Sequence, residues 1–212
     1  MSLVEADGEW RVRKDTDWTS IAVRRSSFPG KHAIDPSMIS VIFVTRDEEE
    51  RLLRSLAALT PFALEGIVSD VVVADLGSRD ATLEIADAAG CAIVEDCPDL
   101  GAAIGRAAVL ARKDWLLRLA AGDIVEGAAA EAALRHIAQA GREGEAGAAA
   151  YLACAKGGAL RRAAHILAFD MLGLAPFPLR RVLAPRTQAH LLDATGRRWP
   201  GTRLKARIER SE

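Results

Sequence analysis

The chain has 212 residues, of which half are hydrophobic and 27% are charged, and its formal net charge is -1. This length and composition are typical of one globular domain with an appendage, and the balanced charge excludes a strongly basic nucleic-acid-binding surface. Aromatic residues make up only 5% of the chain, which argues against a surface that stacks on bases.

The cysteines and the hydropathy pattern bear on where the protein resides. Its 3 cysteines are an odd number without metal-ligand spacing, which is typical of thiols in a reducing compartment. The N-terminus is acidic and polar, unlike a signal peptide, and no apolar run reaches the roughly 18 residues that a membrane helix needs. We therefore expect a cytoplasmic protein, and peripheral contact with a membrane is left open.

Residues 1–37 differ from the rest of the chain. They mix charges and turn residues and show no sustained apolar period. This pattern predicts a flexible N-terminal extension with one short strand near residues 19–23.

From residue 38 to residue 154 the chain alternates between short apolar runs and amphipathic stretches. The apolar runs are rich in β-branched residues, which is typical of strands buried on both faces. Such alternation predicts an α/β fold with a mostly parallel, Rossmann-like sheet and helices on both faces. Pro61 is expected to end the first helix. The expected strands are 39–44, 67–74, 91–94, 115–119 and 148–154, and the expected helices are the Leu-rich helix that Pro61 ends, 81–89, 102–112 and 126–140.

Beyond residue 154 the pattern is looser. We expect a helix at 161–172, a strand at 181–184, a short helix at 187–192, and a basic tail that frays from residue 197. The pairs Arg161-Arg162 and Arg180-Arg181 can bind a diphosphate or an acidic membrane surface, but paired basic residues are more often part of a solvated rim.

Polar side chains follow the first two predicted strands. Thr45 ends the first strand, and Asp75 ends the second. In parallel α/β sheets, ligands bind outside the carboxyl ends of the strands, so the binding site is expected there. Gly77 allows a sharp turn after Asp75, and Ser78 and Asp80 also have a plain interpretation as helix caps.

Four segments in this order resemble family-two glycosyltransferases with the GT-A fold. Ser40 to Glu49 (SVIFVTRDEE) is similar to the opening Ser-Val-Ile-Ile-Pro-Thr-x-Asn-Glu-Glu of that family, and Val73 to Thr82 (VADLGSRDAT) resembles its Val-Asp-x-Gly-Ser-x-Asp-x-Thr element. Gly101 to Ala107 (GAAIGRA) resembles the start of a family helix, and Asp114 to Leu119 resembles the strand that precedes its metal-binding Asp-x-Asp motif.

The resemblance implies a transferase that moves a sugar from a nucleotide-diphosphate donor, expected to be UDP-linked, to a hydroxyl acceptor. It implies an acceptor side within residues 155–212. Asp75 is expected beside the base or ribose. Arg106 either contacts phosphate or is an exposed helix residue. The substrate-binding residues implied in this way are Thr45, Asp47, Glu48, Asp75, Gly77, Gly101 and Arg106.

The metal-binding element departs from the family pattern. Ala120-Ala121-Gly122 stands where the family has Asp-x-Asp, and Asp123 follows one residue later. Hard cations prefer carboxylate oxygens, so Asp123 can be the surviving ligand of a Mg²⁺ or Mn²⁺ ion. Alternatively, Asp123 is the cap of the next helix. The degenerate motif leaves two hypotheses: an active glycosyltransferase, or an inactive GT-A-fold protein that binds a nucleotide or a partner. No catalytic base is recognisable.

Overall fold

A computed structural model of the chain describes residues 2–6, 9–14, 17–20, 39–143, 149–154, 181–193 and 202–210. The helix expected at 161–172 and the basic pair Arg161-Arg162 lie outside the described residues.

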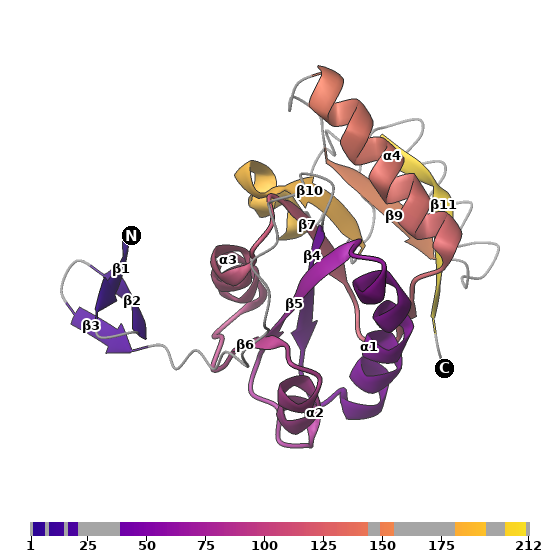
Figure 1. Ribbon diagram of the computed structural model, residues 1–212. Helices are drawn as coiled ribbons and strands as arrows, with labels where there is room; N and C mark the ends of the chain where they lie inside the picture. Colours follow the sequence, from indigo (N-terminus) through magenta and orange to yellow (C-terminus); the bar gives the residue numbers. More distant parts are fainter. Residues whose placement is uncertain are drawn as a thin grey trace.

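The centre of the fold is a parallel sheet (Figure 1). Its strands lie in the order β6-β5-β4-β7 and are fully parallel, as the alternating pattern predicted. The side chains of Val41, Ile42 and Phe43 are all completely buried, which explains the unbroken apolar run in this part of the sequence. The bounds of these strands are β4 (Ile39–Thr45), β5 (Val68–Asp75), β6 (Ala92–Val94) and β7 (Trp115–Leu119).

The other half of the sheet is mixed. Strand β10 (Val182–Pro185) pairs antiparallel with both β7 and β9 (Ala150–Cys154). Strand β11 (Thr202–Arg210) pairs parallel with β9, and the two-residue strand β8 (Asp123–Ile124) pairs with the end of β11. The expectation that the basic tail frays is therefore wrong. Leu204 and Ile208 are buried, and this even spacing of apolar residues between charges is a strand signal.

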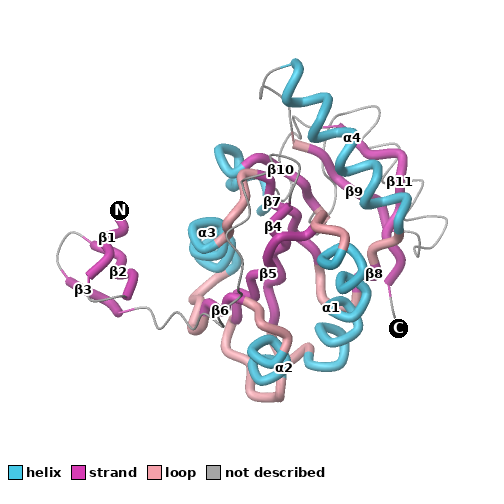
Figure 2. The backbone as a smooth tube through the Cα atoms, viewed as in Figure 1, coloured by secondary structure: helices cyan, strands magenta, loops and turns pink. Residues whose placement is uncertain are grey.

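Helices cover both faces of the sheet (Figures 1 and 2). The helices α1 (Glu49–Leu64), α2 (Thr82–Ala88) and α4 (Gly127–Glu143) pack around Val41 and Phe43 on one face. The helix α3 (Leu100–Leu110) and the 3₁₀ helix η2 (Arg186–Asp193) pack around Ile42 on the other face. Within the described residues, no helix combines the length and apolar character needed to cross a bilayer.

Helix α1 continues past Pro61, contrary to the sequence-based expectation. It ends at Leu64, and the φ of Gly66 is 77° just beyond it. Pro61 lacks an N–H, but its carbonyl still accepts a 2.9 Å hydrogen bond from the N–H of Glu65. Phe62 packs against the buried core, so tertiary contacts stabilise the final turn.

The N-terminal segment contains more strand structure than expected. Strands β1 (Ser2–Ala6), β2 (Glu9–Lys14) and β3 (Asp17–Ser20) form an antiparallel three-stranded sheet, whereas the sequence suggested one strand near residues 19–23. The sequence between the first two strands is Asp-Gly, a dipeptide that favours hairpins.

Candidate functional site

The carboxyl ends of β4 and β5 bring two predicted site residues together. Thr45 pairs in register with Asp75, and both residues are almost fully buried. The Thr45 hydroxyl donates a 3.3 Å hydrogen bond to Oδ1 of Asp75. Because parallel strands end at the same edge of the sheet, these residues form the floor of the expected site.

The carboxylate of Asp75 holds the loop that follows β5. Its Oδ2 accepts hydrogen bonds from the N–H groups of Gly77 at 2.8 Å and Ser78 at 2.7 Å, and its Oδ1 accepts one from the Ser78 hydroxyl at 2.5 Å. The φ of Gly77 is 92°, a conformation that favours glycine. Asp75 is only 1% exposed, so in this structure its charge acts on the loop backbone. Direct contact between Asp75 and a nucleoside stays a prediction.

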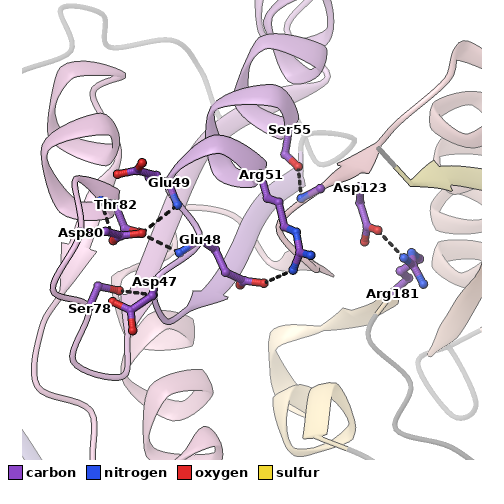
Figure 3. A network of polar contacts seen from close by, with 11 residues as sticks. Asp47, Glu48, Glu49, Arg51, Ser55, Ser78, Asp80, Thr82, Asp123 and Arg181 are labelled. Atoms are coloured by element: carbon purple, nitrogen blue, oxygen red, sulfur yellow. Dashed lines mark hydrogen bonds and ion pairs between the residues drawn. The ribbon is translucent and has the colours of Figure 1, made fainter. Parts of the chain in front are cut away.

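The loop between β4 and α1 is bonded to the loop after β5 (Figure 3). The N–H of Asp47 donates to the Ser78 hydroxyl at 2.9 Å, and Oδ1 of Asp47 accepts a 2.7 Å hydrogen bond from the N–H of Arg79. Asp47 has a φ of 51°, which is uncommon for a non-glycine residue. This reciprocal pair of bonds fixes Asp47 at the edge of the site, with its side chain exposed.

The first turn of α1 is capped by residues from the other loop. The side chain of Glu48, the N-cap residue of α1, makes no capping hydrogen bond. Instead, the N–H of Glu48 donates to the Thr82 hydroxyl at 3.0 Å and the N–H of Glu49 donates to Asp80 at 3.2 Å. Asp80 also accepts a 3.0 Å bond from the N–H of Thr82. The cap interpretation of Asp80 is therefore supported, and the carboxylate caps two helices at once.

Replacing Asp80 by Asn is expected to weaken this double cap and to change how stability depends on pH. Burial opposes the charge of Asp80, but hydrogen bonds from the hydroxyl and N–H of Thr82 and from the N–H of Glu49 together hold its pKa below the usual value. A depressed carboxyl pKa adds stability above the unfolded-state pKa, which is lost as the pH falls through the folded-state pKa.

Urea unfolding at a series of pH values from about 6 to 2 measures this contribution. The wild type should lose more stability than Asp80→Asn over the acidic part of the range. Asp87→Asn is the matched control, because Asp87 is an exposed carboxylate on α2, the helix that Asp80 precedes. Parallel pH profiles for the wild type and Asp80→Asn would contradict the assignment.

Helix α3 brings Arg106 close to the same strand ends. Its guanidinium donates to the carbonyl of Asp96 at 3.4 Å, next to Cys97. The N–H of Cys97 in turn donates to the carbonyl of Asp75 at 3.0 Å, and burial raises the pKa of the Cys97 thiol. Gly101 lies exposed in the first turn of the same helix. The structure thus places Arg106 beside the loop after β6, which is bonded to the main chain of Asp75, and Gly101 on the same helix.

Glu48, the N-cap residue of α1, directs its side chain toward Arg51 (Figure 3). Its carboxylate is 3.5 Å from the guanidinium of Arg51, and the two side chains are 22% and 51% exposed. An ion pair with this much exposure contributes little to stability, so both side chains can rearrange around a ligand.

Asp123 is the first residue of β8, beyond the turn that follows β7, and it is completely buried. Its Oδ2 accepts a 2.8 Å hydrogen bond from the N–H of Ala120, so it closes the turn after β7. Its Oδ1 forms an ion pair with Arg181, which comes from the start of β10 (Figure 3). The side chain of Asp123 therefore caps its own turn, whereas helix α4 begins later, at Gly127.

The described residues around Asp123 do not fit a divalent cation. Both oxygens of Asp123 already have protein partners, and one of those partners is a cation. Ala120 and Gly122 have no side-chain oxygens, and the N–H of Gly122 donates to the buried Ser55 hydroxyl of α1 at 2.9 Å. Among the described residues, no group of three or more His, Cys, Asp or Glu could hold a metal ion. For Asp123 to bind a metal, Arg181 would have to move away.

Comparisons with known proteins agree with this architecture. Residues 40–166 match the model of a family described as glycosyl transferase family 2. Among curated proteins, none has a sequence that matches the chain.

Solved structures share the fold. Glucosyl-3-phosphoglycerate synthase from Mycobacterium tuberculosis, in complex with Mn²⁺, UDP and glucosyl-3-phosphoglycerate, superposes with a TM-score of 0.55 and 19% identity, over 83% of this chain and 72% of that one. Mannosyl-3-phosphoglycerate synthase from Rubrobacter xylanophilus gives a TM-score of 0.55 and 14% identity, over 82% of this chain and 67% of that one. A mycobacterial protein superposes with a TM-score of 0.57 and 17% identity, over 93% of this chain and 74% of that one.

Proposed function

Since this chain belongs to glycosyl transferase family 2, we propose that it moves a sugar from a nucleoside-diphosphate donor to a hydroxyl acceptor. The observation that carries this proposal is the bonded pair of loops at the carboxyl ends of β4 and β5. These loops contain the two motifs that resemble the family, and the hydrogen bonds of Asp47, Asp75 and Asp80 hold them as one unit. The family match does not favour an inactive protein.

In this proposal the nucleoside lies over the loop that Asp75 organises. Thr45, Asp75 and Gly77 form the floor, Arg106 closes one side, and Glu48 lies on the other. The nucleoside contacts hydroxyl and backbone groups, while the diphosphate extends toward the end of β7. A fixed frame of this kind favours transfer, because a sugar held in one orientation presents its anomeric carbon to the acceptor.

The donor and acceptor classes are proposed from the neighbours. The Mycobacterium tuberculosis enzyme is described with UDP and glucosyl-3-phosphoglycerate, so a UDP-linked donor and a small hydroxyl acceptor that carries an anionic group are the first to test. We propose that the acceptor side falls within residues 155–212 and the donor side within 38–154. A cytoplasmic location and contact with a membrane surface stay predictions from the sequence.

That enzyme is also described with Mn²⁺, and the sequence suggested Mg²⁺ or Mn²⁺ at Asp123 in this chain. A divalent ion bound to a diphosphate would neutralise the charge of this leaving group. The described residues do not fit the ion, so no step of the present proposal passes through it.

Nucleotide binding provides the first test. UDP at about 100 times its dissociation constant should stabilise the folded protein by about 2.7 kcal/mol, which a thermal shift assay detects as a higher Tm. UDP, GDP and ADP are compared, and release of nucleoside diphosphate from the matching sugar donors is then measured with hydroxyl acceptors, including 3-phosphoglycerate.

The matched control is Arg135→Gln. Arg135 is an exposed residue of α4 whose guanidinium forms an ion pair with Glu131 on the same helix. It should bind as the wild type does. Failure of every nucleoside diphosphate to raise the Tm would contradict the proposed donor. Binding without release of product across the donor panel would instead support the non-catalytic alternative.

A further inference from the structure

We propose that the guanidinium of Arg181 provides the positive charge that faces the donor diphosphate, in the place where relatives of this fold hold a metal ion. This inference rests on the proposed function, because it assigns a partner to the phosphates of the same donor.

The strand register places Arg181 at the right position. Val182 of β10 pairs with Arg118 of β7, so Arg181 lies beside Leu119, the last residue of β7. The carbonyl of Arg181 accepts a 3.0 Å hydrogen bond from the N–H of Leu152 on the neighbouring strand β9. The backbone of Arg181 is therefore fixed on the side of β9. The side chain reaches the turn that aligns with the metal-binding motif of the family.

The local carboxylate holds the guanidinium instead of a metal. Asp123 has no exposed surface, and the side chain of Arg181 is only 12% exposed. Nε of Arg181 has no hydrogen-bond partner among the described residues. A guanidinium has five N–H donors in a rigid fork, and a fork anchored by one carboxylate can still bind phosphate oxygens with its remaining donors.

The substitutions at the motif are consistent with this exchange. Ala120 and Gly122 remove the two carboxylates that would attract a cation. A divalent ion at Asp123 would lie beside the fixed positive charge of Arg181, and like charges repel strongly where water is excluded. A buried Arg–Asp pair requires no metal, and the diphosphate then meets a permanent cation of the protein.

The test separates phosphate contact from general destabilisation. Isothermal titration calorimetry measures binding of uridine and of UDP, each with EDTA and with Mn²⁺, to the wild type, Arg181→Gln and Arg181→Lys. EDTA should change UDP affinity by less than about twofold. Arg181→Gln should lower UDP affinity by about tenfold or more, which corresponds to one lost charge-assisted contact, and leave uridine affinity unchanged. Arg181→Lys should recover part of the UDP affinity.

Arg186→Gln is the matched control. Arg186 follows the other end of β10 and binds the main-chain carbonyls of Ala111 and Lys113, away from the site. Loss of this arginine also removes a part-buried guanidinium from an end of β10, but it should leave both affinities unchanged. If UDP does not bind and another nucleoside diphosphate does, the same comparison is made with that nucleotide and its nucleoside.

Electron paramagnetic resonance of Mn²⁺ gives a readout that needs no nucleotide. The protein alone should leave the free Mn²⁺ signal unchanged. Binding of Mn²⁺ that disappears in Asp123→Asn, or UDP binding that EDTA abolishes, would overturn this inference and leave the proposed function standing. Equal losses of uridine and UDP affinity in Arg181→Gln would also overturn it. Failure of the wild type to bind any nucleotide would contradict the proposed function. Arg181 would then have no donor diphosphate to bind.

Discussion

Asp123→Ala is expected to lower the free energy of unfolding by about 3 to 5 kcal/mol, because it leaves the charge of Arg181 uncompensated in a buried position. The same change removes the acceptor for the N–H of Ala120 and so loosens the turn after β7. Chemical unfolding in urea, followed by far-UV circular dichroism, measures the loss as a lower midpoint at an unchanged slope.

A second substitution distinguishes loss of the pair from loss of the turn. When Asp123→Ala is combined with Arg181→Met, the buried charge is gone, and much of the lost stability should return. A double-mutant cycle with Arg181→Met alone then gives the coupling energy between the two side chains. An Asp123→Ala variant within 1 kcal/mol of the wild type would show that the pair is not buried in solution, by comparison with the effect expected above.

Asp75→Ala is expected to cost at least about 3 kcal/mol, since each charge-assisted hydrogen bond contributes roughly 1.5–3 kcal/mol and water can replace only part of the bonds lost. The bonds lost are those from the hydroxyls of Thr45 and Ser78 and from the N–H groups of Gly77 and Ser78. The loop after β5 then loses its anchor, and we expect nucleotide affinity to fall below detection in the calorimeter.

Asp75→Asn separates these effects, because the amide keeps one acceptor oxygen and the size of the side chain. It should retain part of the stability and show an intermediate affinity. Asp87→Ala serves as the control, since Asp87 is exposed on α2. Nucleotide affinity that survives Asp75→Ala would place the binding site away from this loop.

Much of the fold and half of the site could be predicted from local patterns. Apolar runs of strand length gave β4, β5 and β7 with bounds that differ from the observed ones by at most a residue. The meeting of Thr45 and Asp75 follows from a rule about parallel strands, because both residues end adjacent strands. The bonds from Asp47 to Ser78 and from Glu49 to Asp80 link two loops that the motifs identify.

The other half depends on contacts that no local pattern encodes. Arg181 was noted as part of a basic pair that can bind a diphosphate, but its partner lies 58 residues away on another strand. The antiparallel register of β10 makes that contact, and nothing in the sequence near Arg181 specifies it. Likewise, α1 continues past Pro61 because Phe62 packs on a core assembled from distant segments. In β11 the apolar residues alternate with charged ones, so the strand pattern is weak in the sequence.

The position of β10 in the sheet also has a consequence for assembly. It lies between β7 and β9, which both precede it in the sequence, so as the chain is synthesised the edge of β7 stays open until residue 185 has emerged. An open edge is a template for pairing with other chains, and non-local strand pairs form slowly. Until β10 is inserted, Asp123 also lacks its cation. Insertion of β10 and neutralisation of the buried carboxylate are therefore one event, which ties this step of sheet assembly to formation of the candidate diphosphate site.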